Sequence, residues 1–411
     1  MLIYFPTPYP GEWWYSVLCR YHVRSGRQKA ATTLHELYGS HPLTHGRLFP
    51  GGDCHAVIKQ LPDGILSLKA VLLEHTLMPY YLRFHSPEKR QSVSSNLLAG
   101  RSGGLTSIQL QTSEGKQGLK FCPICRSKDT ETYGEPYWHR EHQIPLMPLC
   151  PKHGCRLQLI EIPLSRLSEA FLPLSTIDMT NKATADSETW EPLLTVALNS
   201  ILSLPFETGP PLEYSNLESA LLSAGFGIHA IRGNVSLDAE KLKESCINFY
   251  GKSIGEQYFT KLSPAVIYRM CHWKLTSPER YALLTVFAGL TIESLLGPEI
   301  PVVDPLLKKL LEYKKKGIAY KKEELAQLVG VSPHQLDSLA KKYNVAPFWK
   351  QCGGKRTETI RITLTAEEKH RIATAAAIHG NGQTAVFARE VLLREVNRIL
   401  KNEMGGKLNE N

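Results

Sequence analysis

The stretch that decides the fold is residues 121–155, FCPICRSKDTETYGEPYWHREHQIPLMPLCPKHGC. It holds two close pairs of metal-binding side chains, Cys122 with Cys125 and Cys150 with His153, in the spacing C-x2-C-x24-C-x2-H. Two such pairs joined by a loop can close a tetrahedron around zinc, for which thiolate and imidazole are usual ligands. The spacing therefore predicts one zinc ion bound by these four residues.

We expect this zinc to be structural, because four protein ligands fill its coordination shell. A catalytic zinc usually keeps three protein ligands and an open position. Glu135, Glu141, His139 and His142 offer general bases by residue type, so a zinc hydrolase or deaminase stays open as an alternative. Neither H-E-x-x-H nor the deaminase pattern H-x-E with P-C-x-x-C occurs, however. Cys155 is left outside the predicted ligand set, and no enzyme activity is expected.

The net charge of the 411-residue chain is +9, and all of this excess lies in the last quarter. Residues 306–411 hold 20 basic and 11 acidic side chains, whereas residues 1–305 hold 28 of each. A basic segment of this kind favours a polyanion such as nucleic acid. The alternative, a basic face that is only solvated, stays open on charge alone.

The chain shows neither a signal peptide nor a membrane segment. Its start, MLIYFPTPYPGEWWY, lacks a basic region and contains three prolines. No stretch approaches about 18 uninterrupted apolar residues. The nine cysteines are odd in number and scattered outside one cluster, which favours reduced thiols and a metal site over a disulfide framework. We therefore expect a cytoplasmic protein without a membrane partner.

Hydrophobic spacing predicts a mainly α, multi-domain chain. Residues 12–85 are expected to be helical, 86–118 to form a loose connector rich in Ser, Gly and Gln, and Ser277 to cap a helix that begins at Pro278. We expect five parts: an N-terminal helical part (1–85), a connector with the zinc finger (86–160), a helical middle domain (161–300), a helix-turn-helix (306–350) and a β-α-α tail (355–405).

The segment KKEELAQLVGVSPHQLDSLAKKYNV (321–345) predicts two short amphipathic helices around Gly330, with Ser332 as the cap of the second. The apolar residues expected to pack between these helices are Leu325, Leu328, Val331, Leu336 and Leu339. An ordinary helical hairpin is the alternative to a DNA-binding role. As DNA-binding candidates the second helix offers His334, Gln335, Ser338, Lys341 and Lys342.

The tail KRTETIRITLTAEEKHRIATAAAIHGNGQTAVFAREVLLREVNRIL (355–400) begins with a strictly alternating stretch, 357–364, which predicts a strand followed by two helices. A single strand with two helices buries its apolar face poorly, whereas a partner copy could pair the strand. The pattern resembles the ribbon-helix-helix family of DNA-binding dimers. A β-α-α appendage packed on the rest of the chain is the alternative. The resemblance implies a homodimer with Thr359, Arg361 and Thr363 in the major groove, and Gly382, Gln383 and Thr384 at a phosphate.

Three further stretches flank the cysteine pairs along the chain: FPTPYPGEWWYSVLCRYHVRSG (5–26), LLEHTLMPYYLRF (72–84) and HWKLTSPERYALLTVFAG (272–289). Together they resemble the TniQ/TnsD family, the target selectors of cut-and-paste transposons, well over 1–160 and weakly over 215–300. The family's zinc ligands match the four residues named above. Some relatives carry a second cysteine cluster, but no cysteine lies between Cys155 and Cys246, so one zinc is expected.

The resemblance implies a non-enzymatic adaptor at the bacterial nucleoid. Such adaptors mark the insertion site and recruit an AAA+ ATPase transposition regulator (TnsC-like). TnsD-type members read a chromosomal sequence in double-stranded DNA themselves, whereas shorter TniQ members dock on a CRISPR RNA-guided effector complex. The basic tail favours direct reading. A CRISPR adaptor is the alternative within the family, and a transcriptional repressor is the alternative outside it.

Overall fold

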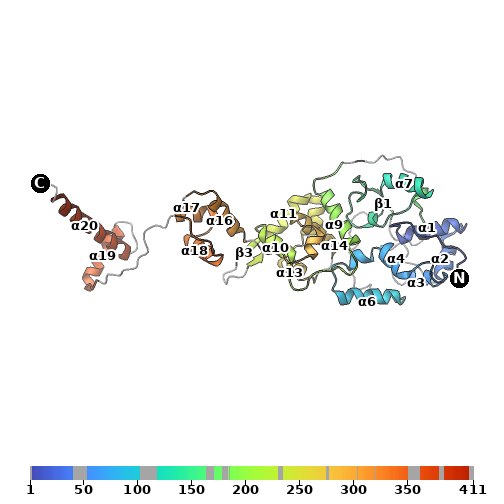
Figure 1. Cartoon of the computed structure of the whole chain (residues 1–411), viewed down its shortest axis with the longest axis horizontal. Helices are drawn as coiled ribbons and strands as arrows, with labels where there is room; N and C mark the ends of the chain where they lie inside the picture. The colour runs from blue at the N-terminus through green and yellow to red at the C-terminus, as the bar shows by residue number, and fades with distance from the viewer. Residues whose placement is uncertain are drawn as a thin grey trace. The chain divides into compact units, whose positions relative to one another are not determined.

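The computed structural model describes residues 2–39, 53–101, 118–162, 171–177, 184, 186–229, 235–274, 277–302, 304–318, 320–349, 362–378 and 384–406 (Figure 1). These residues are mainly helical, as predicted, and contain two small antiparallel sheets. Contacts divide the chain into two compact units, Met1–Gly317 with Leu339–Val345 and Ile318–Ser338 with Ala346–Asn411. The five domain boundaries expected from the sequence stay predictions. None of the described helices is long and apolar enough to cross a membrane.

The N-terminal part is built from short helices, which confirms the helical prediction for the described part of 12–85. Its first helix is buried over most of its length and is tied to two distant segments. The Trp13 N–H donates to the Trp138 carbonyl at 2.8 Å, and the Trp14 N–H donates to the His75 carbonyl at 2.8 Å. The first bond anchors the helix start to the cysteine-bearing stretch, and the second anchors it to the residue after α4. The elements are α1 (Trp14–Arg24), α2 (Ala30–Tyr38), α3 (Asp53–Ile58), α4 (Leu68–Glu74) and α5 (Met78–Leu82).

The connector expected at 86–118 is wrong over its first part, because α6 (Pro87–Leu98) is a regular helix. Ser86 is its N-cap, and the Ser86 Oγ accepts a hydrogen bond from the Lys89 N–H at 3.3 Å. Proline at the first helical position suits a helix start. Val93 and Leu97, one turn apart, are buried. The serine-rich composition concealed a helix start of the same kind as the one predicted at 277–278.

A two-stranded sheet closes the stretch that carries the cysteine pairs. β1 (Leu119–Phe121) pairs antiparallel with β2 (Gln158–Ile160), so that Phe121 lies opposite Gln158. Between the strands lie α7 (Pro123–Tyr133) and a 3-10 turn, η2 (Glu141–Gln143). The sheet therefore brings the two ends of the 121–155 stretch together. A Cβ at Gly118 would come within 2.1 Å of the Ile160 carbonyl oxygen, which explains the glycine.

The middle part is helical, as predicted, and shares one continuous cluster of buried apolar side chains with the N-terminal part, from Leu2 to Leu295. The hairpin of β3 with β4 was not predicted from the sequence. Ser277 does precede α14, although its hydroxyl donates to the Glu279 carboxylate at 3.1 Å instead of capping the helix. The elements are η3 (Leu174–Thr176), α9 (Glu191–Ser203), α10 (Asn216–Ser223), β3 (Gly227–His229), β4 (Val235–Leu237), α11 (Ala239–Gly251), η4 (Lys252–Glu256), α12 (Gln257–Phe259), α13 (Pro264–Cys271), α14 (Pro278–Phe287), α15 (Ile292–Leu296) and α16 (Pro305–Lys315).

Arg83 joins the N-terminal part to the middle part. Its side chain is only 1% exposed. The guanidinium donates to four carbonyl groups in the last turn of α9 and in the segment that follows it, those of Ile201 (2.9 Å), Leu204 (2.6 Å), Pro205 (2.7 Å) and Thr208 (2.6 Å). The last carbonyls of a helix have no partner within the helix, and a cation there is favourable. Arg83 therefore provides hydrogen-bond donors for carbonyl groups at the end of a helix in the middle part.

The two helices predicted around Gly330 are present as α17 (Lys322–Val329) and α18 (Pro333–Lys342). Gly330 has a φ of 87°, the left-handed conformation that ends many helices, and its N–H donates to the Ala326 carbonyl at 2.9 Å. Ser332 caps α18: its hydroxyl accepts from the Gln335 N–H at 3.3 Å, and the Gln335 side chain accepts from the Ser332 N–H at 2.9 Å. The predicted turn and cap are confirmed.

One predicted packing residue of this hairpin is wrong. Leu328 is 43% exposed, whereas its neighbour Val329 is fully buried, together with Leu325 and Leu336. Leu325 and Val329 are four residues apart and share a helix face, while Leu328 stands at its edge. On α17 the prediction is therefore confirmed for Leu325 and wrong for Leu328, whose place is taken by Val329.

The two helices predicted for the tail are present as α19 (Ala366–Ile378) and α20 (Thr384–Gly406). Thr365 caps α19, because its hydroxyl accepts from the Glu368 N–H at 3.3 Å and the Glu368 carboxylate accepts from the Thr365 N–H at 2.8 Å. Residues 362–364, the end of the predicted strand, lie outside regular secondary structure. Residues 350–361 and 379–383 lie outside the described residues.

Candidate metal centre

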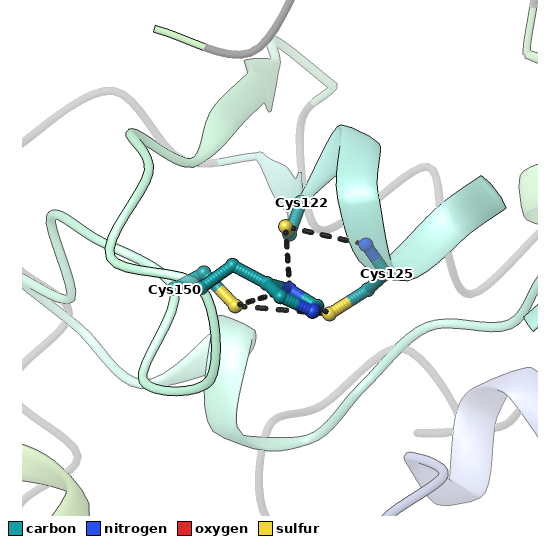
Figure 2. A group of neighbouring side chains, drawn as sticks. Cys122, Cys125 and Cys150 are labelled. Carbon is teal, nitrogen blue, oxygen red and sulfur yellow. Dashed lines mark hydrogen bonds between the residues drawn. The ribbon is translucent and has the colours of Figure 1, made fainter. Parts of the chain in front are cut away.

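Cys122, Cys125, Cys150 and His153 come together as predicted from their spacing. Each offers one ligand atom, and these four atoms all lie within 4.8 Å of one another. Figure 2 shows the cysteine side chains converging from the start of α7 and from the loop that bears Cys150. All three cysteines are buried, and His153 is half-buried. Among the described residues this is the group of His, Cys, Asp and Glu side chains suited to a metal ion.

The spacing of the ligand atoms fits tetrahedral zinc. With Zn–S bonds of about 2.3 Å and Zn–N bonds of about 2.0 Å, tetrahedral angles require S···S edges of about 3.8 Å and S···N edges of about 3.5 Å. The sulfur atoms of Cys125 and Cys150 are 3.7 Å apart. His153 Nδ1 lies 3.4, 3.3 and 3.6 Å from the sulfur atoms of Cys122, Cys125 and Cys150. These four distances agree with the edges of a four-ligand zinc site, and a complete Cys3His set is typical of structural zinc.

Local structure holds each ligand pair in place. Cys122 is the N-cap of α7, and its sulfur accepts a hydrogen bond from the Cys125 N–H at 3.3 Å. Hydrogen bonds with Cys125 and Cys150 hold the pKa of Cys122 well below its ordinary value, which favours the thiolate that a metal needs.

In the second pair, the Gly154 N–H donates to the Cys150 carbonyl at 2.8 Å, and Gly154 has a φ of 65°. A side chain at residue 154 would strain this tight turn.

Cys155, which the sequence left outside the ligand set, lies beside it. Its sulfur is 3.3 Å from that of Cys122, shorter than the edge of about 3.8 Å that two zinc-bound sulfurs require. Cys155 is not part of the four-residue group. Its thiol is therefore placed as a hydrogen-bond partner of a ligand rather than as a ligand.

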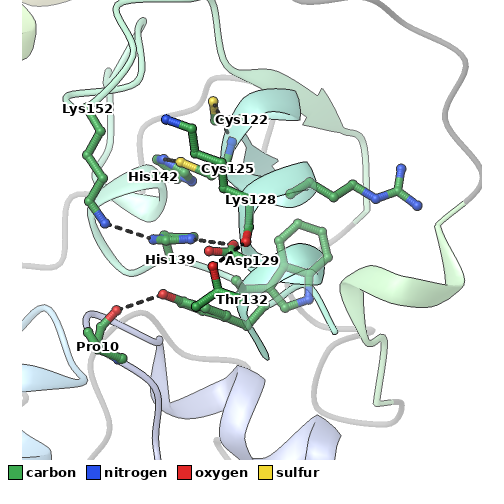
Figure 3. Close-up of polar contacts among 12 residues, drawn as sticks. Pro10, Cys122, Cys125, Lys128, Asp129, Thr132, His139, His142 and Lys152 are labelled. Atoms are coloured by element: carbon green, nitrogen blue, oxygen red, sulfur yellow. Dashed lines mark hydrogen bonds and ion pairs between the residues drawn. The ribbon is translucent and has the colours of Figure 1, made fainter. Parts of the chain in front are cut away.

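The side chains that suggested catalysis are engaged in hydrogen bonds and ion pairs with other protein groups. His139 Nε2 lies 2.8 Å from Asp129 Oδ2 (Figure 3). His139 Nδ1 lies 3.4 Å from Glu141 Oε1. Although burial alone lowers it, these hydrogen bonds raise the pKa of His139 above its ordinary value. Glu135 accepts hydrogen bonds from Arg20, at 2.8 Å, and from Arg24. None of these carboxylates or imidazoles faces the four ligands as a free general base.

His142 lies closest to the ligands among the predicted bases. Its side chain is fully buried, and its Nε2 is 3.9 Å from the Cys125 sulfur. Burial lowers the pKa of His142 to about 3, so the ring is neutral. A neutral ring can donate one N–H toward the Cys125 thiolate, which supports the ligand instead of activating water.

Asp129 and Lys152 were not singled out from the sequence, although both join the charged group around His139. Asp129 follows Cys125 by four residues on α7, and Lys152 Nζ lies 3.2 Å from Glu141 Oε1. The helical spacing of Cys125 and Asp129 could have placed both residues on one helix face. Nothing in the sequence pairs Asp129 with His139 across the intervening turn.

The predicted DNA-binding residues lie outside the metal centre. His334, Gln335, Ser338 and Lys341 are exposed on α18, as predicted, and the side chain of Lys342 lies outside the described residues. In the tail, Thr363 is exposed and Thr384 begins α20. The remaining predicted contacts lie outside the described residues: Thr359, Arg361, Gly382 and Gln383.

Comparison with known proteins identifies the part of the chain that bears this centre. The TniQ family model matches residues 3–157. The transposition protein TnsD of transposon Tn7 from Escherichia coli is 28% identical over 155 residues. That match covers 36% of this chain and 30% of the relative, so the chain aligns with less than a third of TnsD. Residues 3–157, which contain all four candidate metal ligands, are therefore similar to the TniQ family and to part of a TnsD transposition protein.

Proposed function

We propose that this protein is a non-enzymatic target selector for cut-and-paste transposition, which reads an attachment sequence in double-stranded DNA and recruits an AAA+ ATPase regulator. The observation that carries the proposal is a TniQ domain followed by a tail that holds all the excess positive charge. The relative's name states a role in transposition. The protein would act in the bacterial cytoplasm, at the nucleoid.

In this proposal one zinc ion, bound by Cys122, Cys125, Cys150 and His153, is structural. The ion would fix the start of α7 against the loop at 150–153, and these four side chains would supply the whole coordination shell. His153 would bind through Nδ1. Its Nε2, which lies 3.1 Å from Lys128 Nζ, would then carry the proton, and the Lys128 side chain would turn to solvent.

DNA reading is assigned to the last quarter of the chain. The α17–α18 hairpin presents His334, Gln335, Ser338 and Lys341 to solvent, which suits a recognition helix. The tail would act as a homodimer through the ribbon, with Arg361 as its main base reader. Exposed apolar residues on the tail support a partner copy, because one chain leaves this surface to water. These residues are Ile362, Leu364, Val391, Leu392, Leu393, Val396 and Ile399.

The second candidate is a TniQ adaptor that docks on a CRISPR effector complex and leaves sequence reading to the guide RNA. Such an adaptor does not need 20 basic against 11 acidic side chains gathered in residues 306–411. A polyanion-binding tail carries sequence-independent affinity on which base reading can build. We therefore favour direct reading.

The recruitment step can be tested with immobilised DNA, the purified zinc-loaded protein and the AAA+ ATPase of the same transposon in the presence of ATP. We expect the ATPase to stay on the DNA only when this protein is present. Beads without DNA, and DNA with the ATPase alone, are the controls. If the protein stays on the DNA but never retains the ATPase, the adaptor role is wrong and the repressor alternative gains support.

A further inference from the structure

A charged bridge of four side chains runs beside the metal centre. It consists of Asp129, His139, Glu141 and Lys152, joined by contacts of 2.8 Å (Asp129–His139), 3.4 Å (His139–Glu141) and 3.2 Å (Glu141–Lys152). Figure 3 shows Lys152, His139 and Asp129 following one another from the loop to α7. None of the four belongs to the group of candidate ligands.

The bridge connects the two pieces of chain that carry the ligand pairs. At one end, Asp129 lies on α7, one helical turn beyond Cys125. At the other end, Lys152 stands between Cys150 and His153 in the sequence. The two ligand pairs are separated by 24 residues, so without a metal ion something else has to set the distance between them. The bridge can set this distance, because its contacts run from α7 to the loop between Cys150 and His153.

His139 is the fixed centre of the bridge. Its side chain is 3% exposed, and those of Asp129 and Glu141 are 10% and 11% exposed. The ring stacks on Tyr137, with centroids 4.3 Å apart, and lies 4.9 Å from the ring of His142. A buried imidazole that meets a carboxylate on each side and is stacked on its face has little freedom to turn.

Its backbone is fixed as well. His139 forms an isolated antiparallel bridge with Glu12, and the next residue, Arg140, donates its N–H to the Gly11 carbonyl at 2.9 Å. The N-terminal segment therefore anchors the centre of the bridge, while its two ends reach the two ligand pairs. The His139 ring also contacts the ring of His142. The Nε2 atom of His142 in turn lies 3.9 Å from the Cys125 sulfur.

We propose that His139 is a positioning residue for the metal centre: it holds α7 and the Cys150–His153 loop at ligand distance, so that zinc enters a largely preformed site. The inference rests on the zinc site proposed above. Groups that orient metal ligands without touching the metal typically contribute 10–100-fold to metal affinity. His139 would contribute in this way through Asp129 and Glu141.

The test compares zinc affinity in the full-length protein and its His139→Ala variant, measured by competition with a chromogenic chelator. We expect the variant to bind zinc about 10–100-fold more weakly. Because all four ligands remain, its cobalt-substituted form should show the same tetrahedral thiolate absorption at saturation. His85→Ala is the matched control, since His85 is also buried but stands just before α6, beside Lys89 and Arg90. The control should keep wild-type zinc affinity.

Two further variants keep the test decisive. If His139→Ala does not fold, Asp129→Asn removes the charge at one end of the bridge while preserving its shape, and it should also weaken zinc binding. Wild-type zinc affinity in these variants would overturn the role of the bridge. Wild-type zinc affinity in Cys125→Ala would instead overturn the zinc site itself, so the two failures are distinguishable.

Discussion

Replacing Cys125 with serine is expected to remove the metal and to unfold the stretch between β1 and β2. The three protein ligands left would need water or the serine hydroxyl in the fourth position, and either one binds zinc more weakly than the lost thiolate. Structural zinc contributes on the order of 10 kcal/mol to small domains, comparable with the whole stability of a typical domain. We expect zinc content to fall from one ion per chain to none, and thermal unfolding to begin well below the wild-type transition. Elemental analysis and calorimetry measure both.

Two serine substitutions serve as controls for the loss of a buried thiol. Cys155→Ser alters a thiol next to Cys122 that is outside the ligand set, and Cys271→Ser alters a buried thiol on α13. Both variants should keep one zinc ion per chain. A full complement of zinc in Cys125→Ser, or its loss in Cys155→Ser, would show that the ligand set has been assigned incorrectly.

The second large effect concerns DNA. Arg361→Ala should cost about 1–3 kcal/mol in binding to a preferred sequence, since a bidentate contact to a base edge carries this much discrimination. Binding to unrelated DNA should change much less, so specificity relaxes. Fluorescence anisotropy with preferred and scrambled duplexes, at one fixed salt concentration, measures the difference.

Arg389→Ala is the control for charge alone, because Arg389 is an exposed basic residue of α20 in the same tail. Arg389→Ala should weaken binding to the preferred and scrambled duplexes by similar factors, as expected for a contact to phosphate. Each factor should be smaller than the loss that Arg361→Ala causes on the preferred duplex. If Arg361→Ala and Arg389→Ala have the same effect on every DNA, the ribbon is not the sequence reader.

The four candidate ligands could be predicted because each pair is local: two residues of spacing and a tight turn are enough to bring two ligand atoms together. The cap of α18 was predictable for the same reason, and Ser332 caps this helix as expected. Where serine-rich composition was given more weight than the helix-start signal, as at Ser86, the interpretation failed.

Contacts between distant segments were not predictable. Asp129 meets His139 only because the chain turns back after α7, and Arg83 meets the end of α9 across more than 100 positions of sequence. Side-chain pairs of this kind follow from tertiary packing, which leaves no periodic signal in one sequence. The strands of the hairpin at 227–237 are three residues each, too short for alternation to be recognised.

The most direct test of direct DNA reading is in vitro selection of duplex DNA by the purified, zinc-loaded protein with no guide RNA or other protein present. The account predicts that sequencing of the bound pool reveals one enriched motif, and that the enrichment disappears in Arg361→Ala. Equal retention of all sequences by the wild-type protein would contradict direct reading. Capture of a CRISPR effector complex in a separate pull-down would then establish the adaptor alternative.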